Sequence, residues 1–74
     1  MVTTHRFVRR WRRTNEIDSS VNFVHYSDTK HFMLATTLIA VDITEAEYNR
    51  AITEMLARTD DPFMTYEYTH SEVS

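Results

Sequence analysis

Arginine and aromatic residues are interleaved near the start of the chain, in the run Arg6-Phe7-Val8-Arg9-Arg10-Trp11-Arg12-Arg13. Guanidinium groups form paired hydrogen bonds with phosphates and carboxylates, and aromatic rings stack on bases or anchor protein contacts. The run therefore suits either a nucleic acid or a protein surface. A purely structural explanation is that the arginines balance acidic residues of the same chain and protect an exposed strand edge.

The distribution of charge ranks these alternatives. Residues 1–13 contain five arginines and no acid, whereas residues 14–74 contain three basic and eleven acidic residues and so carry a net charge of −8. A strongly acidic body repels phosphate. Protein contact and the purely structural explanation therefore rank about level, and nucleic acid ranks behind both. For a functional site we expect a surface that binds a larger protein, with nucleic acid as the alternative ligand of the same segment. The site residues are Phe7, Arg9, Arg10, Trp11, Arg12 and Arg13.

The remaining residue types give no catalytic, metal or cofactor site. Glycine is absent, which excludes the glycine-rich loops that bind phosphate, and cysteine is absent, which excludes disulfides and thiolate chemistry. The four histidines show no spacing typical of metal ligands; they are His5, His25, His31 and His70. We therefore expect neither enzyme activity nor a cofactor.

An amphipathic helix is predicted from Glu45 to Arg58. Thr44 and Glu47 have the spacing of a capping box, and Ile43 and Tyr48 have the spacing of a hydrophobic staple. Apolar residues then recur at the helical period at Tyr48, Ala51, Ile52, Met55 and Leu56. Pro62 follows soon after, and the residue before a proline is disfavoured in a helix.

Strands are predicted on both sides of this helix, at Thr4–Thr14, Val21–Tyr26, Phe32–Val41 and Phe63–Thr69. The first segment also has a helical interpretation, but its Thr, Phe, Val and Trp residues favour a strand, which would lie at an edge of the sheet. Asn15–Ser20 reads as a loop. Met64, Tyr66 and Tyr68 are expected to share one face of the last strand.

A hairpin is predicted around residues 27–30, a segment of Ser, Asp, Thr and Lys that is typical of turns. A four-residue loop places Tyr26 opposite His31 and His25 opposite Phe32. The run Phe32–Val41 is apolar on both faces, and one helix can cover only one of them. The spare face is then covered by another segment, twisted or bulged near Thr36-Thr37, or buried against a second molecule as in a homodimer.

These elements predict an α+β fold. Its sheet is mainly antiparallel with three to four strands in the order β-β-β-α-β, and the helix packs across one face. We expect one domain over residues 1–74, with residues 1–4 and 70–74 frayed. No apolar run is long enough to cross a membrane, so we expect a cytoplasmic protein with no membrane partner.

The composition leads to a functional hypothesis. A short, acidic chain without cysteine or catalytic motifs is typical of phage-encoded inhibitors of host enzymes, which is an analogy of composition alone. We expect a small non-enzymatic regulator or inhibitor that occupies a surface of a larger protein. The alternative is a nucleic-acid-binding module that places its Arg/Trp-rich segment on phosphates and bases.

Overall fold

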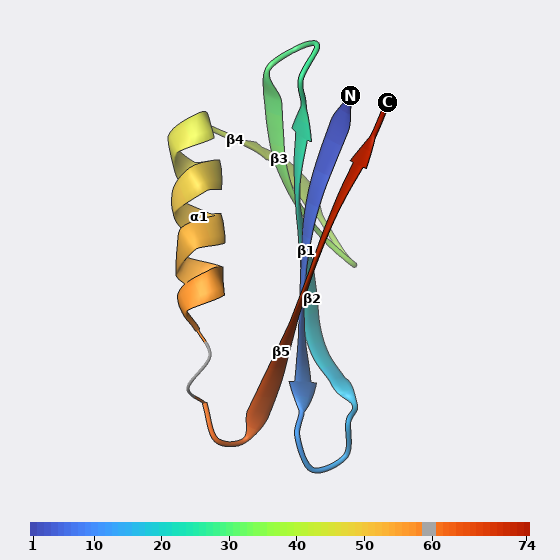
Figure 1. Ribbon diagram of the computed structural model, residues 1–74, viewed down its shortest axis with the longest axis vertical. Helices are drawn as coiled ribbons and strands as arrows, with labels where there is room; N and C mark the ends of the chain where they lie inside the picture. Colours follow the sequence, from blue (N-terminus) through green and yellow to red (C-terminus); the bar gives the residue numbers. More distant parts are fainter. Residues whose placement is uncertain (59–60) are drawn as a thin grey trace.

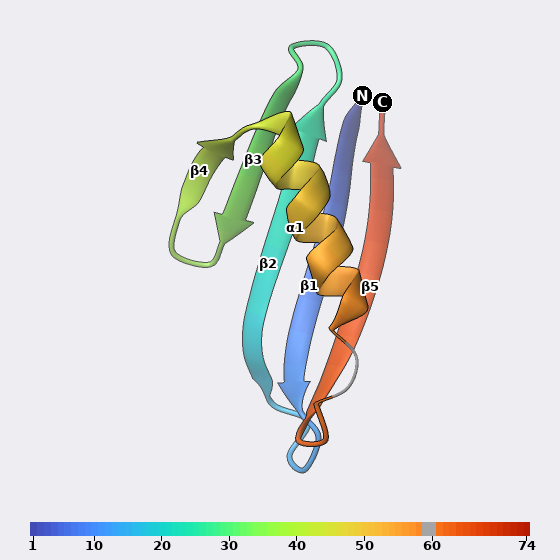
Figure 2. The same cartoon turned by 90° about the vertical axis from the view of Figure 1, so that its left-hand side faces the viewer.

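Five antiparallel strands form one sheet, and a helix lies across one of its faces (Figures 1 and 2). This computed structural model describes residues 1–58 and 61–74. Its elements are β1 (Val2–Trp11), β2 (Ile17–Tyr26), β3 (His31–Thr36), β4 (Ala40–Ile43), α1 (Glu45–Ala57) and β5 (Met64–Val73). Their order across the sheet is β4-β3-β2-β1-β5. The α+β class and the antiparallel pairing are confirmed, and the number of strands is corrected to five.

A tight turn at residues 37–39 accounts for the additional strand. The Thr36 hydroxyl accepts hydrogen bonds from the backbone N–H groups of Leu38 (3.3 Å) and Ile39 (3.2 Å). The Thr36 N–H also donates to the Ile39 carbonyl at 2.7 Å. The predicted single strand Phe32–Val41 is therefore wrong, because the chain reverses and β3 pairs with β4. The turn points Leu38 into solvent, where it is 91% exposed.

The first strand lies inside the sheet, so its prediction as an edge strand is wrong. β5 pairs with β1 along ten residues, from Val2 opposite Val73 to Trp11 opposite Met64. These partners are far apart in sequence, and the local pattern of β1 contains no sign of them. The same ladder orders residues 2–4 and 70–73, which were expected to fray.

The β1–β2 hairpin is also longer than predicted, because β2 already begins at Ile17 within the expected loop Asn15–Ser20. Asn15 makes the turn with a positive φ of 62°, a conformation that asparagine tolerates better than most residues. At the other end of β2, Tyr26 pairs with His31 and His25 with Phe32, which confirms the predicted register.

The helix begins as the sequence predicts. The Thr44 hydroxyl accepts from the Glu47 N–H at 3.1 Å, and the Glu47 carboxylate accepts from the Thr44 N–H at 3.2 Å, so both halves of the capping box are present. The helix ends at Ala57, one residue before the predicted end. Its Tyr48 is buried against three phenylalanines of the sheet, Phe7, Phe23 and Phe32.

The molecule is elongated, with extents of 41 × 21 × 19 Å. The helix runs diagonally from β3 toward β5, and the two ends of the chain lie together at one end of the long axis (Figures 1 and 2). The β1–β2 turn and the start of β5 lie at the opposite end, beyond the helix (Figure 1). The arginine-rich segment is therefore placed at this far end of the molecule.

Candidate functional site

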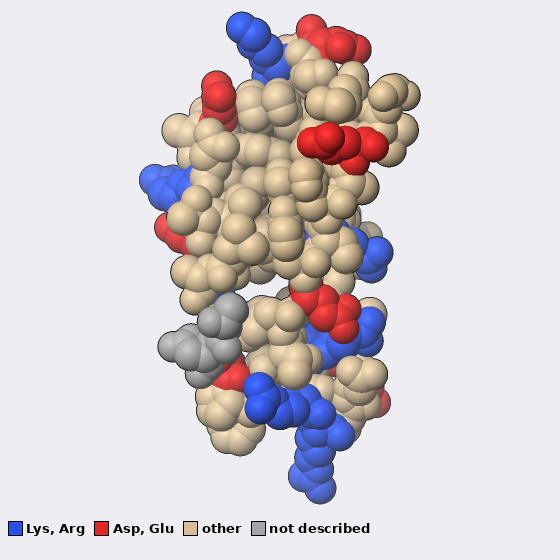
Figure 3. Space-filling model, in the orientation of Figure 1, with Lys and Arg blue, Asp and Glu red and all other residues tan. Residues whose placement is uncertain are grey.

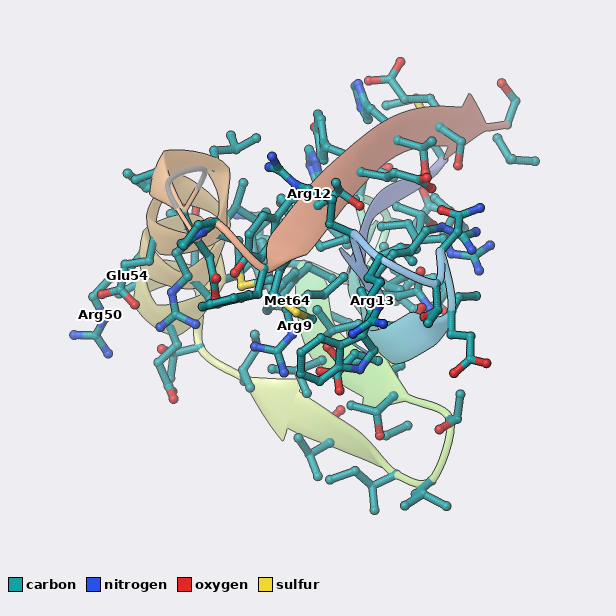
Figure 4. All side chains as sticks on the ribbon, turned by 90° about the horizontal axis from the view of Figure 1, so that it is seen from below. Arg9, Arg12, Arg13, Arg50, Glu54 and Met64 are labelled. Carbon is teal, nitrogen blue, oxygen red and sulfur yellow. The ribbon has the colours of Figure 1, made fainter. Side chains whose placement is uncertain are left out.

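Basic side chains gather at the far end of the molecule, where β1 turns into β2 (Figure 3). We call this end, formed by residues 9–18 and 61–64, the basic tip. Figure 4 views it along the long axis and shows Arg9, Arg12, Arg13 and Met64 well apart from Arg50 on the helix. The tip unites the arginine-rich segment with the start of β5, a segment that is distant in sequence.

Two exposed aromatic side chains flank a pocket at the tip. Trp11 is 46% exposed and Phe63 is 71% exposed. The pocket between them has a volume of about 240 Å³ and is lined by Arg9, Trp11, Asp18, Asp61, Phe63 and Met64. Large aromatic groups that stay exposed in a small protein are typical anchors of protein contacts.

The backbone holds both aromatic residues in place. The Arg12 N–H donates to the Phe63 carbonyl at 3.0 Å, which ties the hairpin turn to β5. The Trp11 N–H donates to the Glu16 carbonyl at 2.9 Å, and the Trp11 carbonyl accepts from the Asn15 N–H at 2.7 Å. The tip backbone is therefore held by hydrogen bonds within the chain, and such preorganisation lowers the entropy lost on binding.

Arg9 is paired with an acid of the neighbouring strand. Its Nε donates to Asp18 Oδ2 at 2.8 Å, and its Nη2 forms an ion pair with the same carboxylate. The register of β1 and β2 skips Asp18, a bulge that turns this side chain toward Arg9. The hydrogen bond with Asp18 raises the already high pKa of Arg9. Arg9 therefore serves the fold in addition to lining the pocket.

The other arginines differ in how many hydrogen bonds their guanidinium groups make within the chain. Arg10 donates to Glu67 at 3.0 Å and to the Asn15 carbonyl at 3.1 Å. Arg12 makes one long contact with the Met64 carbonyl, at 3.5 Å. Arg13 forms no hydrogen bond or ion pair with any residue in the part of the chain that the structure describes. Arg12 and Arg13 therefore keep donors for a partner, whereas Arg10 is held against the sheet.

Phe7 is not part of the tip surface. It was expected to share the partner-binding face, but it is only 5% exposed and packs against Phe23 and Tyr68 in the core. One face of β1 does carry Phe7, Arg9 and Trp11. The helix covers this face at Phe7 but does not extend as far as Trp11. The alternation of residues in the sequence shows which side chains lie on the same face of the strand. Whether a side chain on that face is buried depends on how far along the strand the helix extends.

The sequence-based site lacks four residues that line the pocket, which are Asp18, Asp61, Phe63 and Met64. Phe63 was assigned to the last strand, whereas it precedes β5 and lies exposed beside Trp11. Its position after Pro62 was a usable signal, because a proline often ends one segment just before another begins. No local sequence pattern marks Asp18 as a site residue, because its contact with Arg9 depends on a bulge in the pairing of β2 with β1.

Histidine and tyrosine side chains form a second cluster, on the helix-covered face near the chain ends. The His5 and His70 rings stack with centroids 4.8 Å apart, and His5 Nδ1 is hydrogen-bonded to the Tyr68 hydroxyl at 2.7 Å. Burial and the neighbouring His70 lower the pKa of His5, while Glu72 opposes this shift. Within the described residues, no group of three or more potential ligands is arranged to hold a metal ion.

No family model, curated protein sequence or solved structure matches this chain. None of the helices in the described part of the chain is long and apolar enough to cross a membrane.

Proposed function

We propose that this protein is a small non-enzymatic regulator or inhibitor that binds a larger protein through its basic tip. The observation that carries the proposal is the pair of exposed aromatic side chains, Trp11 and Phe63, on a backbone that is already ordered. Aromatic and arginine side chains dominate the binding energy of protein interfaces. Occupying a surface of the partner is sufficient for regulation and requires no catalytic group.

The chemistry of the tip describes the surface it would recognise. Trp11 and Phe63 fit an apolar depression, and Arg12 and Arg13 beside them fit carboxylates at its rim. The tip also presents the acidic residues Asp18 and Asp61 at the pocket. Acidic groups among the arginines favour a mixed protein surface over the uniform negative charge of a nucleic acid.

Affinity capture with matched variants tests this proposal. The wild-type chain and Trp11→Ala are each used to capture partners from lysate of the natural host cell, with and without nuclease. For the protein captured by the wild type, Trp11→Ala is expected to weaken binding by about 2 kcal/mol or more, roughly thirtyfold in Kd. Isothermal titration with the purified partner measures this change.

Tyr26→Ala is the control, because Tyr26 is an aromatic residue of similar exposure, 38%, on a different hairpin. It should bind as the wild type does, and circular dichroism should show both variants folded. A partner that binds Trp11→Ala and the wild type equally would contradict the proposal, as would a folded chain that captures no protein.

Nucleic acid is the second candidate, favoured by the guanidinium groups of Arg12 and Arg13 next to an exposed indole, since among the described residues only the Met64 carbonyl accepts from either of them. If these arginines contact phosphates, the affinity for a duplex oligonucleotide should fall with salt with a log–log slope of about 0.9 for each neutralised phosphate. Arg12→Gln with Arg13→Gln should then reduce that slope by about two. Binding that is absent or insensitive to salt would exclude this function.

A further inference from the structure

β5 is an unprotected sheet edge ten residues long. One side of the strand pairs with β1, and no strand among residues 1–58 and 61–74 pairs with its other side. Edge strands of soluble proteins are usually blunted by proline, lysine, a bulge or a short length. β5 contains no proline or lysine, and its register with β1 runs without a shift. This edge therefore offers a regular row of backbone donors and acceptors.

The two acidic residues of β5 do not protect this edge. Glu67 accepts a hydrogen bond from Arg10 at 3.0 Å, and Glu72 pairs with His70 at 3.4 Å. Arg10 balances the charge of Glu67, and Glu72 lies near the end of the strand, so an approaching strand meets little unbalanced charge along most of β5. The opposite edge of the sheet, β4, has only four residues and cannot support a ladder of the same length.

Apolar surface flanks the free edge on the helix side. Tyr68 and Leu56 are each about half exposed, at 41% and 48%. With Phe7, Met55, Tyr66 and one charged residue, Glu67, they line a hollow of about 80 Å³ between α1 and β5. In Figure 2 the end of the helix lies over β5, the outermost strand on that side of the sheet. A strand added to β5 would cover it.

From these observations we infer that β5 pairs with β5 of a second copy, antiparallel, about a two-fold axis at Tyr68. An axis perpendicular to the sheet keeps both helices on the same side and pairs residues that share a face. The register centred on Tyr68 uses nearly the whole strand, residues 64–72. It stacks Tyr68 on its own copy and sets Tyr66 opposite His70, which are favourable aromatic cross-strand pairs.

Charge supports this register and this occupant. Glu67 lies opposite Thr69 of the second copy and Glu72 opposite Met64, so no like charges oppose each other. Both copies use the same strand, so the interface is isologous and assembly stops at two chains. The outer edges of the resulting ten-stranded sheet are then the two short β4 strands. The dimer carries its two basic tips at opposite ends, since the paired strands run in opposite directions.

The absence of cysteine from the chain provides a direct test of the register. In the proposed dimer Tyr68 meets itself, at a Cα separation of about 4.5–5.5 Å that a disulfide can span. Tyr68→Cys should therefore form a disulfide-linked dimer under mild oxidation. Tyr66→Cys alone should not, because its two copies lie four residues apart along the ladder, about 14 Å.

Mixed variants keep the test valid if Tyr68→Cys does not fold. Tyr66→Cys and His70→Cys should each stay monomeric on a non-reducing gel, and their mixture should give a disulfide-linked dimer because these positions oppose each other. Sedimentation equilibrium of the wild type should show a dimer that dissociates on dilution. A wild type that is monomeric at high concentration, or cross-linking that is equal at all three positions, would overturn the inference.

Discussion

At the scale of single residues, His5 links the fold to pH. Its ring stacks on His70, bonds to the Tyr68 hydroxyl and lies edge-on to Tyr48 beneath the helix. Burial and the neighbouring His70 lower its pKa, and Glu72 only partly opposes this shift. The folded chain therefore holds a proton on His5 less readily than the unfolded chain does.

We predict that stability falls in acid because of His5. The contribution of His5 is fully present above the unfolded pKa of 6.5, and it is lost as the pH falls through the lower pKa of the folded state. Urea unfolding between pH 7.5 and pH 5 measures the effect. The His5→Gln variant has no titratable group at this position, so its free energy of unfolding should vary less over this pH range. If its pH dependence equals that of the wild type, a group other than His5 takes up the proton on unfolding.

At the scale of elements, the capping box of α1 carries the best-defined local energy. Thr44 satisfies the Glu47 N–H, and Glu47 in return satisfies the Thr44 N–H. The Thr44 hydroxyl also donates to the Glu47 carboxylate at 2.9 Å. This hydrogen bond, together with the one from the Thr44 N–H, lowers the pKa of Glu47, so the cap is strongest above the usual pKa of a glutamate. The cap fixes the start of the helix that brings Tyr48 onto the sheet.

Thr44→Ala should cost about 1 kcal/mol of stability, because it leaves the first helical N–H groups without their side-chain acceptor. Thermal unfolding followed by circular dichroism measures this loss. Thr53→Ala is the matched control on the exposed face of the same helix, where alanine is the better helix former and the change should be neutral or stabilising. Equal losses in both variants would contradict a specific role of the cap.

The helix could be predicted from the sequence because its signals lie within a few residues of one another. The β2–β3 register could be predicted for the same reason, since a four-residue turn sets it. The turn after Thr36 could not, because it uses a threonine hydroxyl and none of the residues that usually mark turns. The position of β1 inside the sheet depends on pairing with β5, which no local pattern specifies.

The candidate site was predictable to a similar degree. Composition identified Trp11, Arg12 and Arg13, which the structure places at an exposed end. It could not separate them from Phe7, which is buried, or from Arg10, whose guanidinium is held by Glu67. Phe63 joins the site only because the chain returns to the same end after the helix.

At the scale of the whole molecule, one aromatic cluster between the helix and the middle of the sheet forms the core. Phe7, Phe23, Phe32 and Tyr48 compose it, and Phe23 is the most buried at 2% exposure. A chain of 74 residues has a total stability of roughly 4–11 kcal/mol. Any one of these rings therefore contributes a large share of the stability of the whole molecule.

Phe23→Ala should cost about 3–5 kcal/mol, because it removes a buried ring and leaves a cavity. We expect much of this variant to be unfolded at 37 °C, as measured by near-ultraviolet circular dichroism and urea titration. Leu38→Ala is the control, with an expected change within about 0.5 kcal/mol because Leu38 is in solvent. A small loss in Phe23→Ala would mean that the core can repack around the gap.

The side-by-side position of the chain ends has a mechanical consequence. Val2 and Val73 are paired in neighbouring antiparallel strands, so a force that pulls the two ends apart acts across the ladder between β1 and β5. Hydrogen bonds in an antiparallel ladder lie perpendicular to the strands. These hydrogen bonds would therefore break one pair at a time, starting at the chain ends, and would not share the load as they do in shear. The protein should therefore unfold under a weak force applied to its two ends, while its far end is still intact.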